Sequence, residues 1–489
     1  ETTFTTNTAT TNGGAIYTIG ETNIDSNNFT NNTAIEGGAI YSDSTSTLTV
    51  DNTEFDTNIA TNNGGAIYTT NETNIDQNTF ANNEANNGGA IYATSTLTIN
   101  NETTFTTNTA TTNGGAIYTS GETNIDNNTF ENNEADNGGA IYSTSTLTVD
   151  NTEFNTNIAT NNGGAIYTTN ETNIDQNTFA NNEANNGGAI YATSTLTINN
   201  ETTFTTNIAT NNGGAIYTSG ETNIDNNTFE NNEADNGGAI YSESTATLTV
   251  NNTEFETNIA TTNGGAIYAT NETNIDTNTF ANNKAIDGGA IYSTSTLTVN
   301  DTTFNTNIAT NNGGAIYTTN ETNIDNNTFE NNEADNGGAI YSESTLTVNN
   351  TEFDTNTATT NGGAIYTSGE TNIDSNTFTN NEAIDGGAIY STSTLTVNDT
   401  TFNTNIATNN GGAIYASGET NIDKNTFDNN EANNGGAIYS ESTLTVNNTE
   451  FDTNTATTNG GAIYTSGETN IDSNTFTNNE AIDGGAIYS

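Results

Sequence analysis

The pentapeptide Gly-Gly-Ala-Ile-Tyr recurs 20 times at intervals of about 25 residues, from Gly13 to Gly484. All 20 tyrosines of the chain lie in this pentapeptide. All 20 phenylalanines lie in a second recurring string, Phe-x-x-Asn-x-Ala, whose first copy contains Phe4, Asn7 and Ala9. One such unit cannot enclose a core by itself. The repeat therefore predicts a solenoid, in which each unit buries its apolar residues against its neighbours.

Two versions of the unit alternate along the chain. One version contains Thr-Asn-Ile-Asp, as in residues 114–137, and the other contains Leu-Thr-Val or Leu-Thr-Ile, as in residues 138–162. The second version carries one extra residue between its Phe-x-x-Asn-x-Ala string and the next Gly pair. The core strings are unchanged by this difference, which is typical of a loop variation in a repeat array.

The composition of the unit favours strands over helices. Asn, Thr and Gly dominate, and no stretch has apolar residues at helical spacing. Each unit holds three short apolar segments, separated by Gly-Gly, Asn-Gly or Asn-Asn, which favour turns. We expect an all-β, right-handed parallel β-helix with about 20 coils of 24–25 residues and three short strands per coil. It would form one continuous array over residues 1–489, as part of a longer chain or fibre.

Strand alternation predicts which side chains face the core. Leu48 and Val50 point inward and Thr49 points outward. In the Ala-Ile-Tyr segment we expect Ile to point inward, which places Ala15 outside together with Tyr. Like side chains would then stack on like in successive coils. The residues that represent these stacks in the first coils are Ile16 and Ile40, Phe4, Phe29 and Phe55, and, on the outside, Tyr17 and Tyr41.

The Asn of Phe-x-x-Asn occupies its place in all 20 copies, beginning with Asn7, Asn32 and Asn58. We expect these amides to point inward and to hydrogen-bond one another from coil to coil. The alternative is that Asn is present only because it tolerates the left-handed backbone conformation at a bend. We interpret the pair Gly13 and Gly14 as structural, because glycine accepts a positive φ and leaves room for a passing backbone.

Charge and composition exclude several kinds of function. The chain has 2 Lys+Arg against 59 Asp+Glu, a net charge of −57, and neither His nor Cys. It cannot neutralise a nucleic-acid backbone, and it has no imidazole or thiol for catalysis or zinc binding. Since every unit offers the same groups, we expect no enzyme active site. We also expect no cofactor and no membrane insertion in this segment.

Acidic residues alternate with neutral ones between units. The Asp after Thr-Asn-Ile occurs in all ten units of one version, and its counterpart is mostly Asn, with Asp51 and Asp150 as exceptions. This alternation would separate like charges along the axis; duplication of a pair of units explains it equally well. Calcium could bind weakly at these carboxylates. The candidate ligands are Asp25, Asp76 and Asp126.

Gly-Gly-Ala-Ile alternating with Phe-x-x-Asn resembles the repeats of polymorphic outer-membrane proteins. The Asn- and Thr-rich chain is also similar to adhesin-like surface proteins of methanogenic archaea. Both resemblances imply a right-handed parallel β-helix that is secreted and displayed on the cell surface. They also imply an adhesin or a fibre of the cell envelope.

We therefore expect an extracellular structural protein, a rigid acidic rod or filament on the cell surface. The alternative is an adhesin stalk that binds glycans or proteins of a host or a neighbouring cell. The expected partners are other copies of the chain, end to end or laterally. The outward tyrosine row could serve lateral bundling or glycan stacking; alternatively, each Tyr packs flat on the neighbouring Tyr and serves only stability. Ice binding by outward Thr is a weaker alternative, because the Thr49 row alternates with Asn, as at Asn23.

Overall fold

The computed structural model describes residues 2–43, 45–243 and 246–489. The chain divides into two compact units, Glu1–Thr247 and Leu248–Ser489. Strands β1 to β38 lie in the first unit and β39 to β77 in the second. Every regular element in the described residues is a β-strand.

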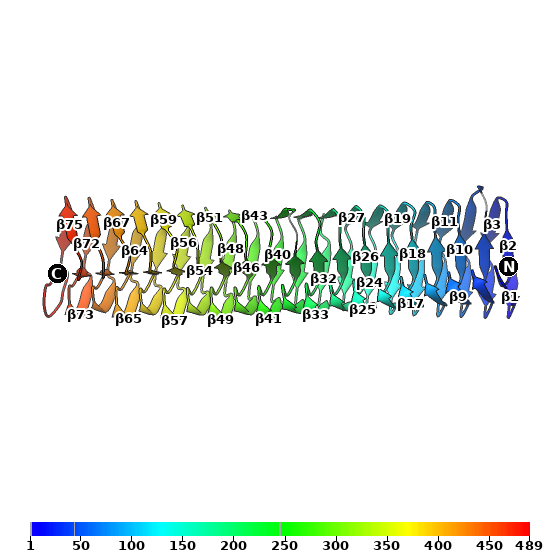
Figure 1. Cartoon of the computed structure of the whole chain (residues 1–489), viewed down its shortest axis with the longest axis horizontal. Coiled ribbons are helices and arrows are strands. Elements are labelled where there is room, and N and C mark those ends of the chain that lie inside the picture. The colour runs from blue at the N-terminus through cyan, green and yellow to red at the C-terminus, as the bar shows by residue number, and fades with distance from the viewer. Residues whose placement is uncertain (1, 44, 244–245) are drawn as a thin grey trace. The chain divides into compact units, whose positions relative to one another are not determined.

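Both units are built from the same four-stranded coil, and every fourth strand pairs in parallel within its unit (Figure 1). The four columns of strands form four parallel sheets. The predicted parallel β-solenoid is confirmed, with about 19 coils in all. A coil of the first unit consists of β10 (Ile67–Thr69), β11 (Thr73–Asp76), β12 (Thr79–Ala81) and β13 (Glu84–Asn87). The following coil consists of β14 (Ile91–Ala93), β15 (Leu97–Asn100), β16 (Thr104–Thr106) and β17 (Thr109–Asn113). A coil of the second unit consists of β46 (Ile291–Ser293), β47 (Leu297–Asn300), β48 (Thr303–Asn305) and β49 (Ile308–Asn312).

The coil has one strand more than the three predicted. The additional strand, β13 or β17, follows the asparagine of the Phe-x-x-Asn string. The Asn and Thr residues of this segment predicted only a turn. Its one inward side chain is an alanine, such as Ala85 or Ala110, and each is about 2% exposed. β17 has five residues where β13 has four, and the register between them shifts at Ala85/Asn87. A bulge therefore absorbs the extra residue of the second repeat version.

Identical positions of successive coils lie directly opposite one another. Ile67 pairs with Ile91, and Phe80 pairs with Phe105. This register places Ile on Ile and Phe on Phe, so that burial is continuous within a unit, whereas each Leu pairs with a Thr, as Leu97 does with the buried Thr73. Phe29, Ile40 and Leu48 are fully buried, as predicted. Adjacent Phe rings stack with centroids 4.6–5.0 Å apart.

The prediction that the alanine of Gly-Gly-Ala-Ile-Tyr faces outward is wrong. Ala15 is half-buried in the first coil, and its counterparts Ala39 and Ala66 are fully buried. The Ala66 carbonyl accepts hydrogen bonds from the amides of both Ala39 and Ile40. The backbone is still bending at the alanine, so the strict alternation of an extended strand begins only at the isoleucine.

The asparagines of Phe-x-x-Asn form a buried ladder, as predicted. Asn7 donates its side-chain amide to Asn32 Oδ1 at 2.8 Å, and Asn32 donates likewise to Asn58 Oδ1 at 2.9 Å. Each amide also reaches the Phe carbonyl of the preceding coil, as Asn58 does with Phe29 at 2.8 Å. The left-handed residue at this bend is the one before the ladder asparagine, for example Asn31 with φ 57°. The alternative explanation of the asparagine is therefore excluded.

A second polar ladder, which sequence reasoning missed, lies at the corner before the Phe strand. Here Thr and Asn alternate from coil to coil. The Thr53 amide donates to Asn78 Oδ1 at 2.8 Å, and the Asn78 amide donates to Thr103 Oγ1 at 3.2 Å. Thr103 is fully buried and Asn78 is 2% exposed. The strict alternation of Asn and Thr at this position could have indicated the ladder from the sequence. The position was not recognised as inward-facing because it lies just outside the strand, where alternation makes no prediction.

The two glycines of each pair have different roles. Gly64 has a φ of +64°. Gly65 lies against the next coil, where an added Cβ would be 2.0 Å from the Gly89 carbonyl oxygen. Both structural reasons proposed from the sequence apply: Gly64 needs its positive φ and also space, since a Cβ there would lie 2.2 Å from the Ile67 carbonyl oxygen, and Gly65 needs space. The pair Gly13 and Gly14 has the same arrangement, with φ +60° and a Gly38 oxygen at 2.1 Å.

Candidate functional site

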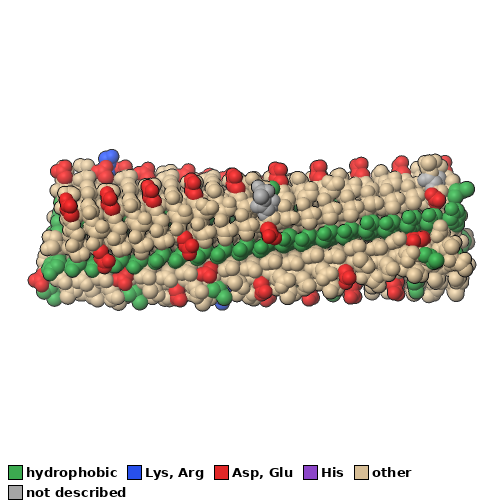
Figure 2. Space-filling model, viewed as in Figure 1, with side chains coloured by type: hydrophobic (Ala, Val, Ile, Leu, Met, Phe, Trp, Pro, Cys, Tyr) green, Lys and Arg blue, Asp and Glu red, His purple; other side chains and the backbone are tan. Residues whose placement is uncertain are grey.

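The most distinctive surface feature is a stripe of stacked tyrosines. It follows the Ile–Tyr strands, including β10, β18 (Ile117–Thr119) and β26 (Ile166–Thr168) in the first unit. Figure 2 shows a continuous hydrophobic row along this column in each unit. The tyrosines inside a unit are half-buried, and Tyr17 in the first coil is 53% exposed.

The tyrosine rings cover one another's faces. Centroids are 5.2 Å apart between Tyr17 and Tyr41 and 4.6 Å apart between Tyr92 and Tyr118, and the planes are within about 10° of parallel. A sugar or a cation that stacks on an aromatic ring needs a free face. Inside the stripe only ring edges and hydroxyl groups reach solvent. The geometry thus disfavours glycan stacking on these faces and leaves hydroxyl and edge contacts available.

Carboxylates line the tyrosine stripe at intervals. The Tyr317 hydroxyl donates a hydrogen bond to Glu343 at 2.6 Å, and Tyr415 donates to Glu441 at 2.7 Å. Desolvation by burial, followed by this hydrogen bond, raises the pKa of Tyr317 well above its usual range. Burial and neighbouring tyrosines raise the pKa of Tyr92 to about 12. The phenols are therefore protonated at neutral pH and act as hydrogen-bond donors.

The acidic residues after Thr-Asn-Ile alternate with Asn as the sequence indicated, for example Asp76 opposite Asn100. At the exceptions, three carboxylates follow one another. Asp51 pairs with both Asp25 and Asp76, and the pKa of Asp51 is raised by desolvation and then by these two charges. A second set consists of Asp126, Asp150 and Asp175, and the pKa of Asp150 is raised for the same reasons.

On the sheet that contains β13 and β17, one outward column alternates between isoleucine or threonine and glutamate, which is replaced by Lys284 in one coil. Ile158, which is 40% exposed, pairs with Glu134 on one side and Glu183 on the other. Carboxylates in this column are thus separated by a whole coil. The alternation lowers charge repulsion along the surface and leaves isolated apolar side chains between the acids.

The structure brings the calcium candidates Asp25 and Asp76 to either side of Asp51, and Asp126 beside Asp150. In the part of the chain that the structure describes, no three acidic groups converge in a way that could hold a metal ion. Calcium binding therefore remains a prediction from the sequence, without a preformed site.

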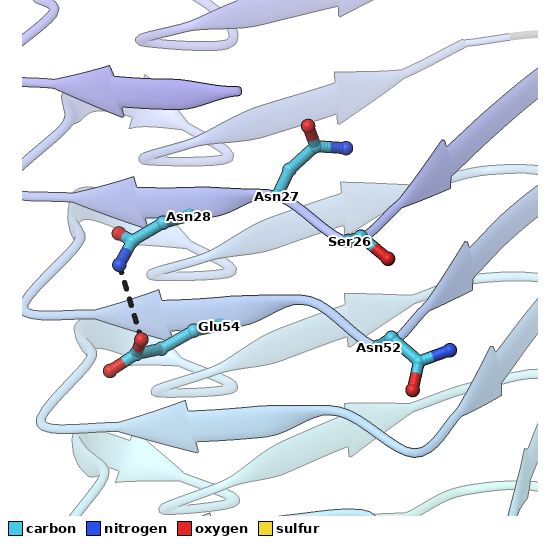
Figure 3. A pocket seen from close by; sticks show the side chains of 5 residues that line it. All are labelled: Ser26, Asn27, Asn28, Asn52 and Glu54. Carbon is cyan, nitrogen blue, oxygen red and sulfur yellow. Dashed lines mark hydrogen bonds between the residues drawn. The ribbon is translucent and has the colours of Figure 1, made fainter. Parts of the chain in front are cut away.

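An open depression lies at the bends between β3 (Thr22–Asp25) and β4 (Asn28–Thr30) and between β7 (Leu48–Asp51) and β8 (Glu54–Asp56) (Figure 3). Asn28 donates a hydrogen bond to Glu54 at 3.1 Å across it. Its side chains are uncharged apart from Glu54, and Asn28 occupies a position that is Thr or Glu in the other copies of the repeat. The residues lining it are Ser26, Asn27, Asn28, Asn52 and Glu54.

A comparison with protein-family models shows which family this chain belongs to. The model described as the Chlamydia polymorphic membrane protein (Chlamydia_PMP) repeat matches 20 segments, which together cover more than half of the chain. The chain belongs to this repeat family. Each matched segment contains one Phe-x-x-Asn string and one Gly-Gly-Ala-Ile string. The matched segments are 1–19, 28–43, 52–70, 79–94, 102–120, 129–144, 151–169, 178–193, 201–219, 228–243, 252–270, 279–294, 301–319, 328–343, 350–368, 377–392, 399–417, 426–441, 448–466 and 475–489.

The family and the fold together fit a surface-exposed structural or adhesin-like protein. The family also suggests an outer-membrane or cell-surface location. The comparison with curated proteins found no match. Within residues 2–43, 45–243 and 246–489, no helix is long and apolar enough to cross a bilayer.

Proposed function

We propose that this protein is an extracellular structural component of the cell surface, an acidic β-solenoid that serves as a stalk or as part of a filament. The observation that carries this proposal is the uninterrupted internal order of the coils. Stacked Phe rings and asparagine ladders run through the described coils of each unit, while the outside carries mainly Thr, Asn and carboxylates. Most of the recurring residues therefore stabilise the solenoid itself.

The sameness of the coils supports a non-enzymatic role. An active site needs unlike groups with different pKa values at one place. The outward residues of the coils described here are drawn from the same small set, and only two basic side chains occur in the whole sequence. We therefore propose that the protein has no catalytic activity and no resident cofactor, and that its partners are further copies of the chain or other surface molecules.

The location is tested on intact cells that produce the protein. Antibodies against the native coils should label unpermeabilised cells, and external protease should remove the label. Because trypsin has only two Lys+Arg residues to cut, a protease specific for acidic residues is the appropriate reagent. Labelling that requires permeabilised cells would contradict an extracellular function.

The choice between filament and stalk depends on assembly. Electron micrographs of material released from the surface should show polymers of the chain if it is a filament protein. Isolated particles attached to a distinct tip would support the alternative, an adhesin stalk. The half-exposed tyrosine stripe and the exposed isoleucines, such as Ile208 at 41%, favour that alternative as contact surfaces. Binding to cultured cells that is lost after Ile208→Ser would support it, and Thr111→Ser on the same sheet is the matched control.

A further inference from the structure

We propose that the tyrosine stripe of each unit, a ladder of stacked rings, is a relay for one-electron oxidation, in which a radical formed on one ring moves along the stack. The chain contains no Cys, Met, Trp or His. Tyrosine is therefore its most easily oxidised side chain, and attack by an external one-electron oxidant, such as a peroxide-derived radical, is directed to the 20 tyrosines.

The ladder places these side chains in close electronic contact. In the first unit the rings stack without interruption from Tyr17 to Tyr241, with centroids 4.5–5.2 Å apart. In the second unit the described stack continues from Tyr268 to Tyr488. Parallel rings at van der Waals separation overlap their π orbitals, and this overlap allows an electron to pass from one ring to the next. The Phe stack has similar spacing, but phenylalanine is much harder to oxidise.

Tyrosine oxidation also releases the phenolic proton, and the structure supplies acceptors for it. Glu343 accepts the hydrogen bond of Tyr317 at 2.6 Å, Glu441 accepts that of Tyr415 at 2.7 Å, and Glu243 accepts that of Tyr217. These pairs recur along the ladder. A phenol that is hydrogen-bonded to a carboxylate can lose its electron and its proton together, which avoids a buried cationic radical.

The proposed step balances at Tyr317 as follows. The external oxidant takes one electron from the ring and is reduced by one electron. The O–H bond of Tyr317 breaks, its proton moves to the Glu343 carboxylate, and a neutral tyrosyl radical remains. An electron from the neighbouring Tyr292 or Tyr341 then reduces this radical, and the proton returns from Glu343 to re-form the O–H bond. The neighbour loses its own phenolic proton to solvent and carries the radical onward. At the last ring an external reductant supplies one electron and solvent returns one proton, which re-forms the phenol.

The relay can be tested in the full-length chain, because the absence of cysteine allows site-specific labelling. Asp43 is exposed and its charge raises the pKa of Tyr41, so the two side chains are close. Asp43→Cys carries a covalently attached ruthenium polypyridyl complex, which a dissolved electron acceptor converts to a one-electron oxidant after a light flash. Tyr191→3-aminotyrosine provides a trap that is more easily oxidised, six positions further along the ladder. The aminotyrosyl radical is then followed by transient absorption and electron paramagnetic resonance.

The relay predicts that the trap radical forms in this labelled protein and that Tyr118→Phe with Tyr142→Phe lowers its yield by an order of magnitude. The matched control is Tyr366→Phe with Tyr390→Phe in the second unit, which should leave the yield unchanged. Circular dichroism checks that each variant is folded. Equal trap yields with and without Tyr118 and Tyr142 would overturn the proposal. So would a radical that stays at Tyr41, or a ladder in which no tyrosyl radical forms.

Discussion

Single side chains in this protein are stabilised mainly by their counterparts in the next coil. Asn133 is fully buried and accepts hydrogen bonds from the backbone and side-chain amides of Asn108, both at 3.0 Å. It donates to the Phe105 carbonyl and to Asn157 Oδ1, both at 2.9 Å. Every polar atom of the amide is used, which explains why the related side chains of Asp, Thr or Ser do not replace it.

We predict that Asn133→Ala lowers the free energy of unfolding by about 2–4 kcal/mol, because it leaves several buried donors and acceptors without partners. Thermal unfolding and amide hydrogen exchange of the flanking coils measure the effect. The control is Asn132→Thr at the adjacent left-handed position, where neighbouring coils already carry Thr107 and Thr156. A loss no larger than that of the control would show that the ladder contributes little.

Asp150 provides a test of the charge alternation. Burial and the charges of Asp175 and Asp126 raise its pKa above the ordinary 3.8, so its ionised form destabilises the folded state at neutral pH. Asp150→Asn should therefore stabilise the protein by about 0.5 kcal/mol at pH 7, a small gain because the residue is only partly buried and solvent screens its charge. The gain should shrink as the pH falls through the raised pKa towards 3.8.

The control for this prediction is Asp374→Asn, because Asp374 already lies between Asn349 and Asn398. Its effect at pH 7 should be smaller than that of Asp150→Asn. Melting temperatures of both variants at pH 7 and at pH 4 give the comparison. An equal gain in both variants, or a gain that does not depend on pH, would contradict the role of neighbouring carboxylates.

At the scale of the element, the corner between the fourth and first strands fixes how closely the coils stack. Gly65 faces the Gly89 carbonyl, and a Cβ on Gly65 would also lie 2.7 Å from the Glu84 amide nitrogen. Both contacts are to backbone and cannot be relieved by a rotamer change. Gly64 combines a positive φ of +64° with a close approach inside its own turn, because a Cβ there would lie 2.2 Å from the Ile67 carbonyl oxygen.

We predict that Gly65→Ala disrupts the stacking of its coil on the next, and that Gly64→Ala is also strongly destabilising because it distorts the turn within its own coil. Gly20→Ala is the neutral control, because no atom lies within 4 Å of the added Cβ. Hydrogen exchange of the coils around residue 65 locates the damage. If Gly65→Ala were as mild as Gly20→Ala, the close approach of neighbouring backbones at this corner would be contradicted.

The sequence predicted those elements whose apolar pattern matches a strand. Leu48, Val50 and Phe29 followed from alternation and are buried. The fourth strand was missed because its inward side chain is only an alanine and its other residues favour turns. The burial of Ala39 was missed because alternation fails where the backbone bends. The tyrosine row was predicted, and the sequence left open whether its rings pack flat on one another or offer free faces to a ligand. The structure shows that they stack.

At the scale of the molecule, the net charge of −57 opposes compaction. Among the described residues the one ion pair is Lys424 with Asp423, at 3.7 Å, so attraction between charges offsets little of the repulsion. The melting temperature should therefore rise as ionic strength increases from about 0.01 M to 0.15 M, where the screening length falls to about 8 Å. Scanning calorimetry in sodium chloride measures it. A melting temperature that is unchanged or lower in salt would contradict net repulsion.

The central structural claim is that each coil lies in register on the next, and engineered disulfides test it most directly. Asn74 and Thr98 are paired neighbours on adjacent coils, while Asn124 lies one coil further on. Adjacent strands are ~4.8 Å apart, within disulfide range, and strands two coils apart are ~9.6 Å apart, beyond it. Asn74→Cys with Thr98→Cys should therefore cross-link under mild oxidation in the native protein, and Asn74→Cys with Asn124→Cys should stay reduced. Cross-linking of the second pair but not the first would contradict the in-register stack.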